Sequence, residues 1–196
     1  MINMGRLVNL VGAICYGAFI YFTLVSGSGV LQLPKILLAL LVVWYLLTVG
    51  KAQATDRRLS SLIVVGAHCG IPLLFSGGGV SLIPIHFALI FAGLGASFSC
   101  LGVLTLSRSF SILPERRKIV SEGIFRFVRH PIYSGYILMG LGALLGSFTL
   151  MNLGLFIIYV LVAVWRTKLE ESVLGSSTEY LEFKGRTKYS LIPGVI

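Results

Sequence analysis

A short cationic element stands where a long hydrophobic segment begins. Residues 123–133 read Gly-Ile-Phe-Arg-Phe-Val-Arg-His-Pro-Ile-Tyr. Pro131 suits the first turn of a helix because its missing N–H has no partner there, and His130 then takes the N-cap position. The N–H groups of such a helix start, together with Arg129 and His130, favour an anionic ligand such as a carboxylate or phosphate. Alternatively, Arg126 and Arg129 bind lipid phosphates and fix the orientation in a membrane.

Two adjacent acids, Glu170 and Glu171, follow another hydrophobic segment, which we expect to end near Trp165. Acidic side chains at the C-terminus of a helix oppose its dipole at a cost of roughly 0.5 kcal/mol each. Either the helix continues well past Glu171, or the carboxylates have a cationic or hydroxyl partner. Arg166, four residues before Glu170, and Lys168 are candidate local partners. Alternatively, the carboxylates meet the ammonium or the hydroxyl groups of a ligand. A ligand with both a carboxylate and an ammonium would then satisfy both charged clusters.

These clusters are set in an unusually apolar chain. Of its 196 residues, 56% are hydrophobic and 12% are charged, and its mean hydropathy is +0.94. Soluble domains carry about 25% charged residues, so the composition predicts an integral membrane protein. The net charge of +9 would also suit nucleic acid, but the basic residues lie between apolar segments, where membrane topology explains them. Cys15, Cys69 and Cys100 lie within apolar segments and match no metal-binding spacing, so we expect neither a disulfide framework nor a metal site.

Long apolar segments recur along the chain and predict an all-α membrane fold. A helix of about 20 apolar residues crosses roughly 30 Å of hydrocarbon. The last two segments are expected to form a helical hairpin that turns at Gly146-Ser147. The six predicted spans are Leu7–Ser26, Pro34–Gly50, Leu59–Phe75, Leu82–Leu106, Pro131–Gly146 and Phe148–Trp165.

The basic residues predict how these spans are oriented. With six spans and a cytoplasmic N-terminus, 15 of the 16 lysines and arginines face the cytoplasm, and only Lys35 lies outside. Such an excess of positive charge is typical of cytoplasmic loops. We therefore expect a multi-pass protein with both termini in the cytoplasm. All seven acids fall on the same side, so we expect the active site there as well.

The chain is predicted to form one membrane domain, residues 1–196. No internal repeat or low-complexity segment divides it. Residues 1–106 hold the first four predicted spans, and residues 107–196 hold a charged loop, the helical hairpin and a C-terminal tail. Small residues at helical spacing, as in Gly95-x-x-x-Ser99, predict that neighbouring helices approach closely.

The C-terminal tail adds further motifs. After the Arg-His-Pro-x-Tyr element come Glu170-Glu171-x-x-Leu174, Glu179-Tyr180-x-x-Phe183, Arg186-Thr187 and Leu191-Ile192-Pro193. Over about residues 104–193, this arrangement resembles the isoprenylcysteine carboxyl methyltransferase family and its prokaryotic relatives, and it is also similar to the phospholipid N-methyltransferases. Two positions differ from that pattern. Phe183 stands where relatives often have tyrosine, and Ser190 stands where many have a basic residue.

The resemblance implies a membrane methyltransferase that uses S-adenosylmethionine (SAM), whose amino-acid part carries both charges described above. Its cofactor pocket would face the cytosol beneath the C-terminal segment, and its acceptor would be a lipid-like molecule such as a prenylcysteine-like carboxylate. Two arginines are the candidate catalytic residues: Arg129 would hold the amino-acid end of the cofactor, and Arg186 would orient the acidic group of the substrate. The residues implied to bind the cofactor are Val120, Gly123, Phe125, His130, Tyr133, Glu170 and Glu171.

Three functional hypotheses stay open. The first is the methyltransferase, whose transfer of a methyl group from a sulfonium depends mainly on positioning. A carboxylate acceptor would need no general base, whereas an amine or thiol acceptor would need His130 or a glutamate as its base. The second hypothesis is an NADPH-dependent membrane reductase of the sterol reductase kind, which is similar in the architecture of its C-terminal half. The third is a non-catalytic membrane scaffold or small-solute protein that uses the motifs for packing. There, His68 and His86 would belong to a polar path, whereas we otherwise expect both to be structural.

Overall fold

The computed structural model describes most of the chain beyond residue 32. The described residues are 10, 12–14, 16–17, 20–21, 33–48, 54–55, 59–75, 78–110, 115–116 and 119–194. Most of the first predicted span, Leu7–Ser26, lies outside them, as do several of the basic residues that predict the orientation.

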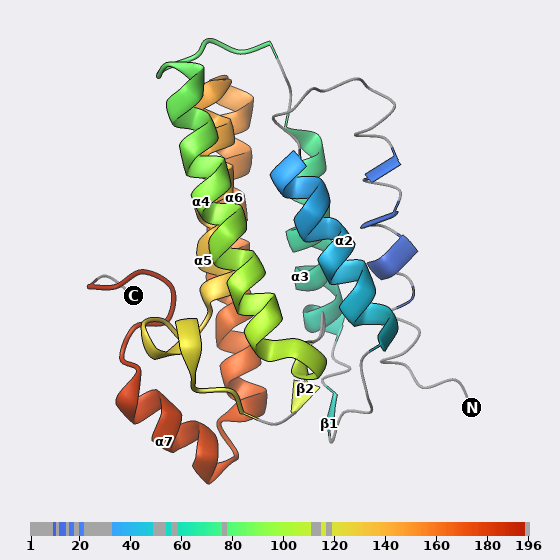
Figure 1. The fold of residues 1–196 in the computed structure, drawn as a ribbon, viewed down its shortest axis with the longest axis vertical. Coiled ribbons are helices and arrows are strands. Elements are labelled where there is room, and N and C mark those ends of the chain that lie inside the picture. The colour runs from blue at the N-terminus through green and yellow to red at the C-terminus, as the bar shows by residue number, and fades with distance from the viewer. Residues whose placement is uncertain are drawn as a thin grey trace.

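The described chain is helical apart from one very short pair of strands (Figure 1). A shorter helix, α7 (Thr178–Arg186), lies at one end of the helix bundle, beside the C-terminal tail. The longer helices are α2 (Leu33–Thr48), α3 (Leu59–Gly70), α4 (Ile85–Leu106), α5 (Pro131–Gly146) and α6 (Leu150–Leu174). Three 3-10 turns connect them: η2 (Ile71–Leu74), η3 (Ser107–Ser109) and η4 (Gly123–Arg126).

Two of these helices, α4 and α6, are long and apolar enough to cross a membrane, with 22 and 25 residues. Shorter apolar helices are present in α2, α3 and α5. The described chain therefore contains helices suited to a bilayer. The number of spans, six by sequence, stays a prediction.

One predicted span is shorter as an α-helix than the sequence suggests. The apolar segment Leu59–Phe75 is α-helical only to Gly70 and then tightens into the 3-10 turn η2. Pro72 lies in the first turn of η2, and its missing N–H cannot continue the α-helical hydrogen bonds. The prediction of one continuous helix over this segment was wrong for that reason.

The last long helix continues further than predicted. α6 begins after Thr149, whose hydroxyl oxygen accepts a hydrogen bond from the Asn152 N–H at 2.9 Å. It ends at Leu174 and not at Trp165, because the polar residues after Trp165 keep the helical conformation. Glu170 and Glu171 therefore lie inside the helix.

Glycines bring α4 and α5 into unusually close contact. A Cβ atom added at Gly95 would lie 2.5 Å from the carbonyl oxygen of Gly135, and one added at Gly135 would collide with the Ser99 hydroxyl. The same hydroxyl donates a hydrogen bond to the Ile132 carbonyl oxygen at 3.0 Å. α5 packs more extensively against α4 than against α6. The close approach predicted from Gly95-x-x-x-Ser99 is confirmed.

The turn between α5 and α6 is fixed at the end of the bundle away from α7 (Figure 1). Val80 and Phe148 exchange both backbone hydrogen bonds, at 3.0 and 2.8 Å. A Cβ at Gly79 would lie 2.5 Å from the Phe148 carbonyl oxygen, so only glycine allows this approach. This turn lies where the sequence predicts the helical hairpin.

A pair of two-residue strands, which the sequence did not predict, lies at the same end of the bundle as α7 (Figure 1). β1 (Ala54–Thr55) pairs with β2 (Glu115–Arg116) in the antiparallel direction. The pair joins the two charged loops of the chain, one before α3 and one before α5. Because each strand has only two residues, the strands are too short for an alternation of apolar and polar residues to predict them.

Candidate active site

Backbone hydrogen bonds join the start of α5 to the C-terminal tail. His130 is the N-cap residue of α5 and Pro131 its first residue, as the sequence predicts. The N–H groups of Arg129 and His130 donate to the carbonyl oxygens of Tyr189 and Ser190, both at 2.9 Å. The tail therefore runs alongside the residues that begin α5.

Two hydroxyl groups attach the same tail at further points. Ser134, in the first turn of α5, donates to the Leu191 carbonyl oxygen at 2.6 Å. Thr187, directly after α7, is buried and donates to the Phe125 carbonyl oxygen at 3.2 Å. The tail is thus bound on both sides of the Arg129 side chain.

Arg129 is buried, with 9% of its surface exposed, and it pairs with both α6 and the tail. Its Nε donates to Oε1 of Glu171 at 2.9 Å. Its Nη1 donates to the carbonyl oxygens of Thr187, at 2.8 Å, and of Lys188. A buried guanidinium is costly unless it is paired, so these contacts both compensate the charge and fix its position.

Glu171 connects three cationic or proton-donating side chains. The oxygen that pairs with Arg129 also lies 3.3 Å from Nε2 of His130. The other oxygen accepts from Nζ of Lys184, on α7, at 2.8 Å. These partners come from the start of α5 and from α7, whereas Lys168, next to the acids in sequence, is exposed. They offset the unfavourable position of an acid near a helix C-terminus.

Tyr133 contacts both the second acid and a buried arginine. Its hydroxyl donates to Oε2 of Glu170 at 2.8 Å. Arg166, one helical turn before Glu170, lies over the Tyr133 ring with its guanidinium carbon 5.0 Å from the ring centroid, a cation–π arrangement. The His130 ring also stacks against the Tyr133 ring, at a centroid distance of 5.8 Å. The first turn of α5 therefore organises the last turns of α6.

An aromatic cluster lies between η4 and α7. Phe125, Tyr180 and Phe183 are buried together, and Val120 packs against them. Burial raises the pKa of the Tyr180 hydroxyl well above its usual value near 10, and the nearby Glu171 carboxylate raises it further. Tyr180 is therefore a neutral aromatic wall and not an acid at physiological pH.

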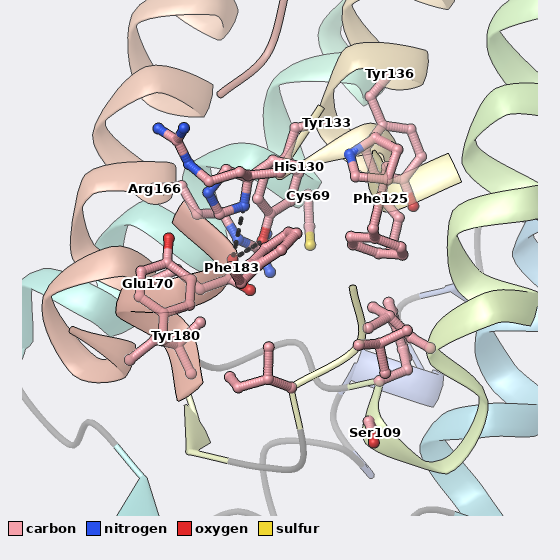
Figure 2. Close-up of a pocket in the computed structure, with 18 of the residues that line it drawn as sticks. Cys69, Ser109, Phe125, His130, Tyr133, Tyr136, Arg166, Glu170, Tyr180 and Phe183 are labelled. Carbon is pink, nitrogen blue, oxygen red and sulfur yellow. Dashed lines mark hydrogen bonds and ion pairs between the residues drawn. The ribbon is translucent and has the colours of Figure 1, made fainter. Parts of the chain in front are cut away.

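These groups surround one open cavity, shown in Figure 2. Arg129, His130, Tyr133 and Glu170 give it a polar side, and the aromatic cluster gives it an apolar side. Tyr16, Cys69, Tyr136 and Arg166 also line the cavity, and we call these four residues its inner end. Tyr136 lies further along α5 than Tyr133, and Arg166 lies earlier on α6 than Glu170. Both directions lead into the bundle, away from α7 (Figure 1).

The structure brings most of the predicted site residues together. The six that line the cavity are Val120, Phe125, Arg129, His130, Tyr133 and Glu170. Glu171 is not among the lining residues, but it holds Arg129 and His130 in place. Gly123 and Arg186 are exposed and do not line the cavity, and Arg186 lies in the last turn of α7.

Gly123 has a conformational role in the described structure. Its φ is +59°, in the left-handed region that favours glycine, and it begins η4. A Cβ there would also lie 3.3 Å from the Thr105 side chain. Glycine thereby permits the tight turn that carries Phe125 to the cavity.

Sequence reasoning missed the inner end of the cavity. Arg166 was predicted only as a local partner of Glu170, although a spacing of four residues places both on one face of α6. The same reasoning, with a spacing of three, would have found Tyr136 from Tyr133. Tyr16 and Cys69 come from other parts of the chain, and nothing in their local sequence places them here.

Comparison with known proteins identifies the family of the chain. The model of the phospholipid methyltransferase family matches residues 79–177, just over half of the chain. The chain belongs to that family, as the resemblance predicted, and is a membrane methyltransferase.

Two plant proteins are similar to the chain over a wider region. Protein-S-isoprenylcysteine O-methyltransferase B of Arabidopsis thaliana is 28% identical over an alignment 137 positions long, which covers 60% of this chain and 69% of the relative. Protein-S-isoprenylcysteine O-methyltransferase A of the same plant is 27% identical over the same shares. The names of both relatives describe methyl transfer to an S-isoprenylcysteine.

Proposed function

We propose that this protein binds SAM in the cavity and transfers its methyl group to the carboxylate of a prenylcysteine-like or other lipid-like acceptor. One observation carries the proposal. The cavity combines a cationic group, a carboxylate and an aromatic wall on three neighbouring elements, and these match the three parts of SAM. Family membership and the printed names of the relatives support the same reaction.

The donor set of the cavity fits SAM. Arg129 uses Nε and Nη1 in the hydrogen bonds described above, and its Nη2 and the His130 ring are the groups we assign to the ligand carboxylate. Glu170 accepts from Tyr133 through Oε2, and we assign Oε1 to the ligand ammonium or ribose. Phe125 and Tyr180 would contact the adenosine ring. Glu171 acts through Arg129 and His130 and is therefore a positioning residue.

The chain contributes positioning and exclusion of water to the reaction. Bound SAM supplies an activated methyl group on its sulfonium. An oxygen of the acceptor carboxylate forms the new C–O bond while the S–CH₃ bond breaks, its electron pair stays on sulfur, and no proton moves. A general base is therefore not needed, and alignment of the two groups near 3 Å lowers the barrier by several kcal/mol. The tail, which covers Arg129, would keep water from the reacting atoms.

We further propose that six helices cross the membrane, with α5 and α6 as a hairpin and with the cavity and both termini on the cytoplasmic side. The distribution of lysines and arginines in the sequence supports this orientation. SAM would then enter from the cytosol, and a lipid-like acceptor would enter from the bilayer. Labelling of single cysteines with a membrane-impermeant reagent tests it, since a cysteine at Lys35 should react only from the outer side.

Calorimetric titration of SAM into the detergent-solubilised protein tests the cofactor. We expect saturable binding that Glu170→Gln weakens by about 10-fold or more, because a charged hydrogen bond is lost. Glu182→Gln removes an exposed acid on α7 and should leave the affinity within about twofold. Heat on titration with NADPH and none with SAM would support the reductase in place of the methyltransferase. The absence of heat with either would support the scaffold.

A further inference from the structure

Part of the inner end of the cavity comes from a region of the chain that the family model does not match. Tyr16 and Cys69 lie outside residues 79–177, the segment that the family model matches. They nevertheless line the same cavity as Glu170. The N-terminal part of the chain therefore contributes directly to the site.

The inner end also holds a buried positive charge. Arg166 has only 5% of its surface exposed, although it lies on α6, a helix long and apolar enough to cross a membrane. A charge at such a place is costly, and it usually marks the binding or movement of a charged group. Arg166 lies one turn, or about 6 Å, further into the bundle than Glu170, so a group bound by it would lie beyond the cofactor site.

We propose that the inner end is the acceptor site, that Arg166 binds the acceptor carboxylate, and that Tyr16 and Cys69 limit which head groups fit. This inference rests on the proposed methyl transfer and assigns its substrate. A cationic or amine head group would meet the guanidinium and be repelled. The phenol and guanidinium groups found there can donate hydrogen bonds to a carboxylate, an acceptor that needs no general base.

Arg186 and Arg166 are both candidates for binding the acidic group of the substrate, but they lie in different environments. Arg186 is exposed at the last turn of α7 and lies outside the cavity lining, whereas Arg166 is buried within it. A carboxylate held next to the cofactor needs a cation inside the cavity. Arg166 therefore replaces Arg186 as the residue that orients the acidic group.

Steady-state kinetics of Arg166→Gln test the assignment. The acceptor is an N-acetyl-S-prenylcysteine in detergent, and its carboxamide serves as an uncharged competitive inhibitor. We expect the acceptor KM to rise at least 10-fold while the dissociation constant for SAM stays within about threefold. The inhibition constant of the carboxamide should stay within about threefold, because it offers no charge to Arg166. Lys168→Gln, which removes an exposed cation two residues along α6, should change none of these values.

A second variant tests the N-terminal wall without removing a charge. Tyr16→Trp adds bulk at the inner end and should raise the acceptor KM several-fold at unchanged SAM affinity, whereas Tyr21→Trp at an exposed position should not. Equal thermal unfolding midpoints of the variants show that the effect is local.

Weaker SAM binding by Arg166→Gln with an unchanged acceptor KM would overturn the assignment of the acceptor site, but not the proposed methyltransferase activity. A wild-type protein that binds no SAM would overturn the methyltransferase itself.

Discussion

Two contacts of α5 are built from opposite kinds of interaction. Along its length, α5 packs against α4 through glycines and a buried serine, with no charged residue at the closest points. At its start, the same helix meets α6 and the tail through ion pairs and hydrogen bonds, centred on Arg129 and Glu171. Glu171 in turn pairs with Lys184 on α7.

We expect the contact between α4 and α5 to determine the stability of the fold, and the polar contact at the start of α5 to determine binding. The α4–α5 contact depends on shape, so any added atom forces the two backbones apart. The polar contact is made by side chains and by a tail, so we expect it to open and reform without disturbing the helices. We therefore expect a ligand to enter beneath the tail while the bundle around it stays rigid.

The largest effect on stability is expected at the glycine contact. Gly135→Ala places a methyl group against the Ser99 hydroxyl and the Gly95 backbone, which should destabilise the fold by about 3 kcal/mol. Gly154→Ala, on the open face of α6, is the matched control, because nothing lies within 4 Å of the added atom. The thermal unfolding midpoint of the solubilised protein measures both. Equal midpoints of the two variants would show that the α4–α5 contact accommodates the added methyl group.

The next effect is expected on binding and not on folding. Glu171→Gln removes the partner that Arg129, His130 and Lys184 share, so the dissociation constant for SAM should rise about 10-fold. Because α4 and α5 do not meet at this side chain, the unfolding midpoint should fall by much less than in Gly135→Ala. If Glu171→Gln lowered the unfolding midpoint as much as Gly135→Ala does, the proposed assignment of stability to one contact and binding to the other would be wrong.

A smaller change is expected when the tail loses one hydrogen bond. Ser134→Ala removes the donor to the Leu191 carbonyl oxygen, and the tail should detach more often. Trypsin should then cleave after Lys188 a few times faster at unchanged unfolding midpoint. Ser172→Ala, whose hydroxyl bonds within α6, controls for loss of a hydroxyl on a helix. Equal cleavage of the two variants would mean that the backbone bonds alone hold the tail.

The smallest effect is expected at the exposed end of the polar contact. Lys184 pairs with Glu171 at 2.8 Å but has about half of its side chain exposed, so water and salt screen the pair. Lys184→Gln should weaken SAM binding by no more than about twofold, and less at high salt. Titration at two salt concentrations measures this, and a loss as large as that of Glu171→Gln would place the lysine inside the site.

The sequence predicted those parts of the molecule that depend on local pattern. Pro131 after His130 set the start of α5, and Gly95 with Ser99 indicated a close helix contact, because both signals lie within a few residues. The end of α6 was placed too early, since the residues after Trp165 are polar and the ion pairs that occupy Glu171 come from distant segments. Tyr16 and Cys69 could not be assigned to the site, because only the packing of separate helices brings them there.

The hydrogen bonds from residues 129 and 130 to the tail have a practical consequence. A stop codon directly after Arg186 would remove every carbonyl group to which Arg129 donates, yet would leave all the long helices intact. Such a shortened chain should still insert into a bilayer but turn over no substrate. Comparing the full-length and shortened chains would therefore separate biogenesis from catalysis.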